Sequence, residues 1–315
     1  MKVIIIGRTK VLLDSAKLLH QKGHEIVGII TSKAAPEYKV NEVDFENYAK
    51  ELNIPFLHDP KIRIKTLDEK FGNTKPDIAI SINYSGIIPS KVIDFFPQGV
   101  LNAHGGDLPR YRGNACQAWA IINGEKEIGL CIHKMIGGEL DSGNIISREY
   151  LPMCDDTTIT HLYKEFDRLI PEMFLECIDI LKTNKNFVLK KQSKLPKDFL
   201  RCYPRKPEDG RIDWKNPAVH IHRLIRASCE PYAGAYTYLD GKKVIIWKSE
   251  LVKSKENWLG VPGQFAEFDG HGFLNILTGK GKLKLTEIEI SKTRSLPKIF
   301  FNSIRNRFNN DRNDF

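Results

Sequence analysis

Hydrophobic residues in the first half of the chain form short continuous runs that alternate with stretches of helical periodicity. The run Lys2–Ile6 is typical of a strand covered on both faces, and Val11–His20 places its apolar side chains at helical spacing. The same patterns predict strands at His24–Thr31, Pro55–Leu57, Asp77–Ile82, Gly99–His104 and Ile128–Met135, and helices at Phe45–Leu52, Lys91–Phe96, Asn114–Asn123 and Thr158–Leu181. Strands that alternate with helices predict a parallel sheet wrapped by helices.

The pattern changes after residue 190. Residues 190–210 are rich in Lys, Pro and Asp, which is typical of a linker. A helix is predicted at Pro217–Ala227, and residues 296–308 repeat apolar side chains every four positions, which predicts an amphipathic helix. Short strands separated by glycine-containing turns are predicted at Ala235–Leu239, Val244–Lys248, Gly263–Phe268, Phe273–Thr278 and Leu283–Ile290.

These patterns together predict an α/β protein of two domains. The first has a Rossmann-like, mostly parallel sheet with helices on both faces, and the second is a smaller, mainly β, OB-like domain. We place the first domain at residues 1–189, the linker at 190–210, and the β-rich C-terminal domain, with a basic tail, at 211–315.

The composition excludes several classes of protein. Hydrophobic residues make up 41% and charged residues 28%, which excludes a mostly disordered chain. No apolar run reaches ~18 residues, so no membrane-spanning helix is expected, and the first apolar run is too short for a secretory signal. The six cysteines show no spacing typical of a zinc site or a redox motif, which indicates reduced thiols and a cytoplasmic protein.

The net charge of +9 is unevenly distributed. Residues 291–315 hold six Lys or Arg and two Asp, so this segment accounts for +4 of the total. The remaining charge is compatible with a phosphorylated small substrate and does not demand a polynucleotide. The loop after the first strand holds Gly7 alone, where a dinucleotide fold needs three glycines, so a nicotinamide or flavin cofactor is not expected there.

The segment VLNAHGGDLPRYRG, residues 100–113, carries the most informative chemistry. Asn102 and His104 alternate onto one face at the carboxyl end of a predicted strand, where open sheets of this kind bind ligands. Two glycines then allow a sharp turn beside the pair. A second polar segment, ELDSG at 139–143, contains Asp141. A polar pair at this place is costly to bury without a function.

These motifs resemble the formyltransferase family that uses 10-formyltetrahydrofolate, which includes methionyl-tRNA formyltransferases and sugar-nucleotide N-formyltransferases. The resemblance implies that Asn102, His104 and Asp141 are the catalytic trio. Similar segments are DIAISINYSGIIP at 77–89, GRIDW at 210–214, IRA at 225–227 and GAYTYLDGKKVIIWKSE at 234–250, so the resemblance covers most of residues 1–290.

The expected chemistry suits these side chains. Formyl transfer to an amine passes through a tetrahedral oxyanion, to which the Asn102 amide can donate. A neutral His104 can accept the proton of the amine, and Asp141 can hold the imidazole and stabilise its charged form. His133 also lies on a predicted strand, and we interpret it as a structural histidine. A catalytically inactive binding module is the alternative, and the intact trio argues against it.

The resemblance also implies a folate pocket. The loop after residue 81 would contribute Ile82, Tyr84 and Ile87 around a flat pterin. The loop ahead of Asp141 would contribute Ile136, Gly138 and Glu139. The co-substrate is then 10-formyltetrahydrofolate, and the scheme needs no metal.

Three amines compete as acceptor. The long C-terminal domain argues against glycinamide ribonucleotide. The loop at 31–45 has two lysines against three carboxylates, which would repel tRNA phosphates. We therefore favour a nucleotide-linked 4-amino-deoxy sugar of the lipopolysaccharide or O-antigen kind, linked to dTDP, UDP or GDP, with methionyl-tRNA as the alternative. We expect Arg8, Thr9, Lys10 and Arg205 to bind this acceptor, with Arg8 and Lys10 supplying the cations for its diphosphate. We expect a homodimer that binds neither nucleic acid nor membrane.

Overall fold

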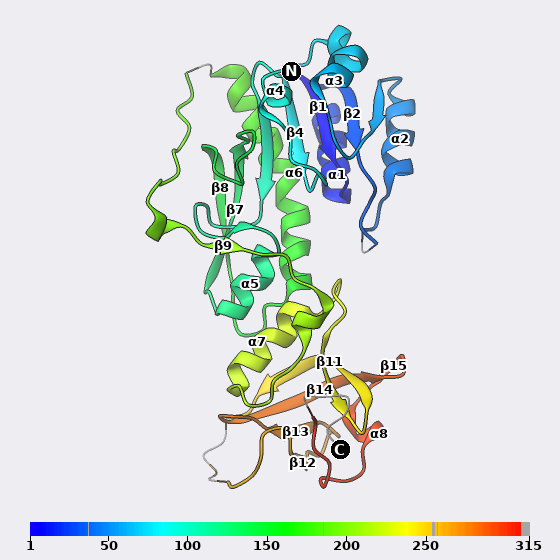
Figure 1. Ribbon diagram of the computed structural model, residues 1–315, viewed down its shortest axis with the longest axis vertical. Coiled ribbons are helices and arrows are strands. Elements are labelled where there is room, and N and C mark those ends of the chain that lie inside the picture. The colour runs from blue at the N-terminus through cyan, green and yellow to red at the C-terminus, as the bar shows by residue number, and fades with distance from the viewer. Residues whose placement is uncertain (37, 185, 254–255, 257, 310–315) are drawn as a thin grey trace. The chain divides into compact units, whose positions relative to one another are not determined.

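The chain is organised in two compact units in a computed structural model that describes residues 1–36, 38–184, 186–253, 256 and 258–309 (Figure 1). The first unit comprises Met1–Cys116, Glu127–Pro152 and Tyr163–Tyr203. The second unit comprises Gln117–Lys126, Met153–Leu162 and Pro204–Phe315. The residue bounds predicted for the catalytic domain, linker and C-terminal domain remain a proposal.

The first unit is built on a seven-stranded sheet in the order β3-β2-β1-β4-β5-β7-β8. Its strands are β1 (Lys2–Gly7), β2 (Glu25–Thr31), β3 (Phe56–His58), β4 (Ile78–Ile82), β5 (Val100–His104), β7 (Glu127–Lys134) and β8 (Ile145–Pro152). Strands β1 to β5 pair in parallel, whereas β7 pairs antiparallel with β5 and β8 antiparallel with β7. The prediction of a mostly parallel sheet is confirmed.

Buried apolar runs explain why these segments form the central strands. Val3, Ile4, Ile5 and Ile6 of β1 are all fully buried, so both faces of this strand are covered. The helices that follow these strands along the chain are α1 (Lys10–Gln21), α2 (Glu42–Glu51), α3 (Ile64–Phe71), α4 (Ser90–Ile93), α5 (Cys116–Asn123) and α6 (Ile159–Thr183). Helix α5 belongs to the second unit from Gln117 on, and α6 belongs to the first unit from Tyr163 on. The sequence pattern missed α3 and β8, because α3 buries only Leu67 and Phe71.

The second unit is built on an antiparallel sheet in the order β10-β11-β14-β13-β12, with β15 paired to β14. The mainly β character predicted for this part of the chain is confirmed. Its elements are α7 (Ala218–Ser228), β10 (Ala235–Leu239), β11 (Lys242–Leu251), β12 (Phe265–Phe268), β13 (Leu274–Leu277), β14 (Lys282–Ile290), β15 (Thr293–Ser295) and α8 (Pro297–Phe300).

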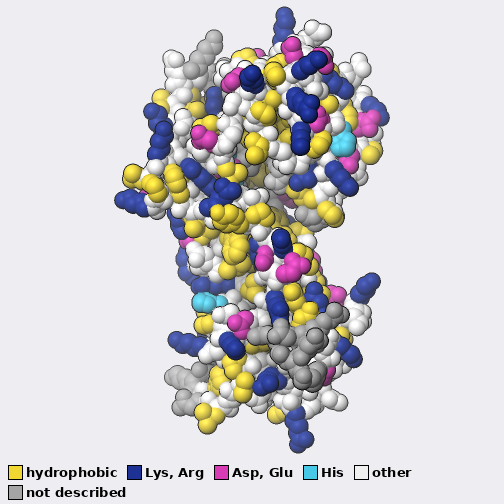
Figure 2. Space-filling model, in the orientation of Figure 1, with side chains coloured by type: hydrophobic (Ala, Val, Ile, Leu, Met, Phe, Trp, Pro, Cys, Tyr) yellow, Lys and Arg dark blue, Asp and Glu magenta, His cyan; other side chains and the backbone are white. Residues whose placement is uncertain are grey.

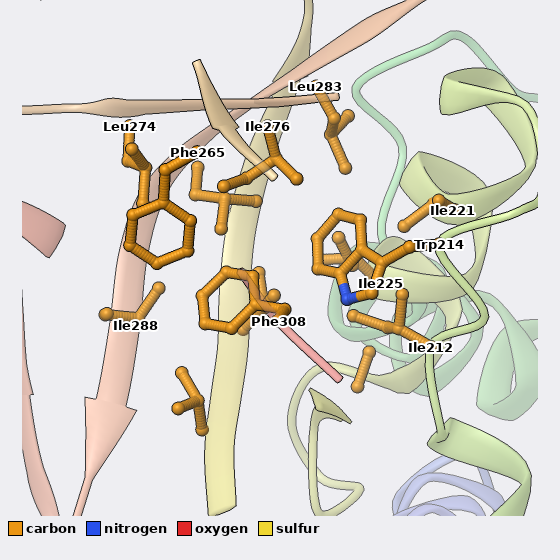
Figure 3. Close-up of a cluster of buried hydrophobic side chains, with 14 of the residues drawn as sticks. Ile212, Trp214, Ile221, Ile225, Phe265, Leu274, Ile276, Leu283, Ile288 and Phe308 are labelled. Carbon is orange, nitrogen blue, oxygen red and sulfur yellow. The ribbon is translucent and has the colours of Figure 1, made fainter. Parts of the chain in front are cut away.

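The core of the second unit corrects the helix predicted at 296–308. Helix α8 ends at Phe300, and the chain continues without a helix so that Phe301 and Phe308 are buried in the core. The Phe308 ring stacks on Trp214 with centroids 5.4 Å apart and an interplanar angle of 13° (Figure 3). A continuous helix would fix both phenylalanines on one helical face, whereas the core takes them from a non-helical segment with a turn at residues 304–305. Residues 310–315 of the predicted basic tail lie outside the described residues.

The segment predicted as a linker contains structure of its own. Two 3-10 helices, η2 (Pro196–Asp198) and η3 (Pro207–Gly210), lie within it. Between them, β9 (Arg201–Cys202) pairs in parallel with β6 (Arg112–Gly113), the strand that follows the β5 motif. This pairing joins the segment to the first unit beside the polar cluster at the end of β5.

Candidate active site

Strands β5 and β7 place three polar side chains of the first unit together. Asn102 and His104 lie at the carboxyl end of β5, and the antiparallel register sets Asn102 opposite His133 of β7. The Asn102 Nδ2 atom lies 3.2 Å from His133 Nε2. His133 Nδ1 donates to the Lys134 carbonyl at 2.9 Å, so Nε2 is left to accept from the Asn102 amide. The second hydrogen of that amide is not used in this contact.

His104 is buried between a carboxylate and a backbone carbonyl. Its Nδ1 lies 3.5 Å from Asp141 Oδ2, and its Nε2 lies 2.6 Å from the Tyr111 carbonyl oxygen. A carbonyl only accepts, so this contact places a hydrogen on Nε2. Gly106 makes the approach possible, because a Cβ there would lie 2.3 Å from the Tyr111 oxygen and 2.6 Å from His104 Nε2. The closest partner of His104 is therefore Tyr111, and Asp141 is more distant.

Asp141 lies between the two histidines, on the loop that joins β7 to β8. Its Oδ1 is 3.6 Å from His133 Nε2, and its Oδ2 accepts from the Gly113 backbone N–H at 2.9 Å. The Gln192 side chain donates to the Asp141 carbonyl at 2.8 Å and holds the loop. The backbone of Asp141 has a φ of 49°, a conformation that L-residues adopt rarely and that is often found at functional sites.

Burial and charge set the protonation of this cluster. Burial lowers the pKa of His104, and the attraction of Asp141 opposes that effect only in part. For Asp141, burial would raise the pKa, but the adjacent His104 and His133 rings and the Gly113 N–H outweigh it and lower the pKa to about 2. The resting site at neutral pH is therefore a carboxylate beside a neutral imidazole, which is the form that can accept a proton.

A histidine titration tests this assignment. We expect the His104 ring to titrate below pH 6.5 in a ¹⁵N NMR titration of the free protein, because burial disfavours its charged form. In Asp141→Asn the titration should move to still lower pH, because the carboxylate that raises the pKa of His104 is gone. A midpoint above 6.5 in the unmodified protein would contradict the account.

The sequence did not reveal that His133 contacts the side chains of Asn102 and Asp141. This histidine is nearly fully buried and contacts both Asn102 and Asp141. The sequence contains one usable signal, since His133 alternates with Ile132 on a predicted strand. That signal could not reveal the register with β5, which alone sets His133 opposite Asn102.

The residues predicted to bind folate differ in their surroundings. Ile82 is buried at the end of β4, whereas Ile87 is 81% exposed. The Tyr84 hydroxyl donates to the Asp59 carbonyl and accepts from the Ile62 backbone N–H, so its polar end already has partners.

The loop ahead of Asp141 is more open. Ile136 and Leu140 are large exposed apolar side chains, Gly138 has open space beside its backbone, and Glu139 accepts from the Ser142 hydroxyl. Exposed apolar side chains on the two loops fit a flat aromatic ligand. The binding role of these residues remains a proposal.

The cations predicted to hold a diphosphate already have partners. The Arg8 guanidinium donates to the carbonyl oxygens of Asn83 and Lys33, both at 2.8 Å. Lys10 pairs with Asp14 one helical turn along α1. Thr9 is the N-terminal cap of that helix, and its buried hydroxyl has no hydrogen-bond partner.

Arg205, in the second unit, donates to the carbonyl oxygens of Ala227 and Asp209 and to the Ser228 hydroxyl. These contacts stabilise the fold around α7.

The residues that the structure describes contain neither a metal-ligand cluster nor a membrane-spanning helix. That part of the chain contains no group of three or more His, Cys, Asp or Glu side chains placed to hold a metal ion. No helix within it is long and apolar enough to cross a membrane.

The chain is similar to known proteins over nearly its whole length. Residues 1–178 match the family described as formyl transferase, and residues 205–305 match the formyl transferase C-terminal domain. The methionyl-tRNA formyltransferase of Geobacter sulfurreducens is 28% identical over 306 residues, which are 96% of this chain and 93% of the relative.

Two solved structures share the fold. WlaRD, a sugar 3N-formyl transferase crystallised in the presence of dTDP and 5-N-formyl-THF, has a TM-score of 0.67 at 22% identity, over 93% of this chain and 98% of that one. HypX from Aquifex aeolicus, in complex with tetrahydrofolic acid, has a TM-score of 0.62 at 19% identity over 95% of this chain. The match covers 46% of HypX, so this chain spans about half its length.

Proposed function

Because the chain belongs to the formyl transferase family, we propose that it moves the formyl group of 10-formyltetrahydrofolate to the amine of a nucleotide-linked 4-amino-deoxy sugar. The observation that carries the reaction type is the buried cluster of Asn102, His104, His133 and Asp141 at the carboxyl end of β5. The choice of acceptor rests on the charge of the loop at residues 31–45.

Asn102 would stabilise the oxyanion. When the amine attacks the formyl carbon, the formyl oxygen gains negative charge, and a fixed amide donor lowers the energy of that state. The contact with His133 occupies one amide hydrogen and sets the orientation of the carboxamide. The second hydrogen is then available to the formyl oxygen.

His104 would take the proton. Its neutral state suits a general base, but its Nε2 faces the Tyr111 carbonyl in this structure. We infer that the acceptor amine takes the place of that carbonyl at Nε2, and that the imidazole hydrogen then lies on Nδ1 beside Asp141. The carboxylate stabilises the imidazolium that forms when the amine loses its proton. The tetrahedral intermediate would then collapse as the bond between the formyl carbon and the folate N10 breaks, and N10 would take the proton from the imidazolium and leave as tetrahydrofolate.

The folate would supply the formyl group from the face lined by Ile87, Ile136 and Leu140. These side chains are exposed and apolar, and they belong to the loops on either side of the cluster. A planar pterin would cover them and exclude water from the reacting carbon.

The choice of acceptor rests on charge. The loop at 31–45 carries more carboxylates than lysines. Within it, Glu42 accepts from the Ala34 backbone N–H and Asp44 accepts from the backbone N–H of Asn41, the N-cap of α2, so two of these carboxylates are fixed in place. A loop of this charge repels phosphates, and the repulsion is larger for a polyanion that follows the loop with several phosphates than for a single diphosphate bound elsewhere.

Methionyl-tRNA is the second candidate, and two observations favour it. The curated relative is a methionyl-tRNA formyltransferase, and residues 190–206 contain seven Lys or Arg against Asp198 alone. A basic segment of this length can follow a nucleic-acid backbone.

Parallel assays decide between the two acceptors. With 10-formyltetrahydrofolate, we expect turnover on a dTDP-, UDP- or GDP-linked 4-amino sugar with shallow salt dependence, because a diphosphate makes few ionic contacts. For charged initiator tRNA we expect little turnover. Efficient formylation of the tRNA, falling steeply with salt, together with no turnover on any amino sugar, would replace the sugar by tRNA.

A further inference from the structure

The short ribbon formed by β6 and β9 sets two arginines directly opposite each other. Arg112 of β6 and Arg201 of β9 are paired residues in the parallel register, so their side chains leave the ribbon side by side. We call these two residues the arginine pair. Like charges directly opposite each other on neighbouring strands are destabilising. An arrangement of this kind is stable when an anion lies between the charges.

Protein carboxylates do not supply that anion. Among the described residues, neither arginine of the pair has a carboxylate within ion-pair distance. The Arg112 guanidinium donates to the neutral Gln192 side chain at 2.6 Å, and its buried Nε has no hydrogen-bond partner. Burial lowers the pKa of Arg112 against the raising effect of Asp141 and Glu139. The pair therefore combines a partly desolvated arginine, Arg112, with an exposed one, Arg201.

Aromatic rings flank both guanidiniums. Arg112 lies over the Phe199 ring at 4.3 Å from its centroid, and Arg201 lies over the Tyr203 ring at 5.5 Å. Tyr203 is 66% exposed, and Phe199 and Leu200, a few residues earlier in the chain, are also exposed. Figure 2 shows positive and hydrophobic side chains mixed on the visible surface. Exposed aromatic rings beside arginines form a stacking surface for a nucleobase.

The ribbon lies directly beside the catalytic cluster. Gly113, next to Arg112, donates its backbone N–H to Asp141 Oδ2 at 2.9 Å. Tyr111, on the other side of Arg112, holds His104 Nε2 through its carbonyl. Arg112 is therefore flanked in the chain by the residue that contacts His104 and the residue that contacts Asp141, so a ligand bound by Arg112 lies near both side chains. An acceptor anchored there could present its amine to His104.

We propose that Arg112 and Arg201 bind the diphosphate of the acceptor, and that Tyr203 and Phe199 stack on its nucleobase. This inference rests on the proposed function and assigns its acceptor site. It also replaces the sequence-based choice of Arg8, Lys10 and Arg205, whose charged groups are already engaged. Arginine forks bind phosphate oxygens bidentately, which a diphosphate with several such oxygens can satisfy.

The test measures binding alone. Titration calorimetry with dTDP, UDP and GDP should show that the protein binds at least one of them, and that Arg201→Ala weakens this binding at least about tenfold. Lys194→Ala removes a positive charge from the same segment outside the ribbon, and it should change the affinity less than about twofold. Binding to none of the three nucleotides, or equal losses in the two variants, would overturn the proposal.

Two further readouts separate this site from a structural role and from the proposed function. Arg201→Ala should keep or raise the melting temperature of the ligand-free protein, because it removes the repulsion, whereas loss of a structural residue lowers it. Arg201→Lys keeps the charge and should retain part of the affinity. If nucleotide binding depended on Arg201 but the protein transferred no formyl group to any amino sugar, the proposed function would be wrong. The diphosphate site at the arginine pair would still be supported.

Discussion

His104→Asn is expected to lower kcat for formyl transfer by ~10²–10⁴ while the protein stays folded, because general-base assistance contributes a factor of that size. Asparagine keeps a polar group of similar volume, but its amide cannot accept a proton at neutral pH. The binding of folate should persist, since the exposed apolar side chains on the two flanking loops are unchanged. Single-turnover kinetics at saturating folate and acceptor measure the effect on the chemical step.

His161→Asn is the matched control for this substitution. His161 lies exposed on α6 and lacks the cluster's contacts, so the same chemical change there should leave kcat within about twofold. Circular dichroism of both variants checks that the fold is intact. If His104→Asn retained a rate within threefold of the unmodified protein, His104 would have no part in the chemistry.

Asn102→Ala is expected to cost ~10²–10³ in kcat, the usual loss when one donor to an oxyanion is removed. The loss should fall on kcat and leave the KM of the acceptor little changed, because the oxyanion exists only in the transition state. The pH at which His104 titrates should stay close to its original value, because the carboxylate that raises the pKa of His104 remains.

An exposed asparagine provides the comparison. Asn302→Ala, at a surface position of the second unit, should leave both kinetic constants within about twofold. A rise in KM at constant kcat for Asn102→Ala would show that Asn102 binds the ground state, and the oxyanion role would then be wrong.

The central strands and the catalytic motif could be predicted because their signals are local. Val3–Ile6 is an unbroken apolar run, and such a run is buried in almost any context. Asn102 and His104 are two residues apart on one strand, so their common face follows from the backbone alone. The order of strands and helices then places that strand end at the edge where a parallel sheet binds ligands.

Other features depend on contacts between distant segments and could not be predicted. The register of β5 with β7 brings His133 to Asn102, and the pairing of β6 with β9 brings Arg201 to Arg112. Residues 296–308 have helical periodicity, yet the core of the second unit takes Phe301 and Phe308 from a chain that is not helical beyond Phe300. In each case tertiary packing overrides or completes a local pattern.

The position of Phe308 in the core also has a consequence for biosynthesis. Domains fold as units, N-terminal parts first, as the chain leaves the ribosome. Phe308 packs on Trp214 and Phe265, but it is translated more than forty residues after the later of these two. The aromatic core of the second unit therefore stays incomplete until residue 308 has been synthesised. The first unit, in contrast, is fully synthesised once Tyr203 has been added. A stalled or prematurely terminated chain would carry a finished catalytic sheet joined to an unfinished, aggregation-prone partner.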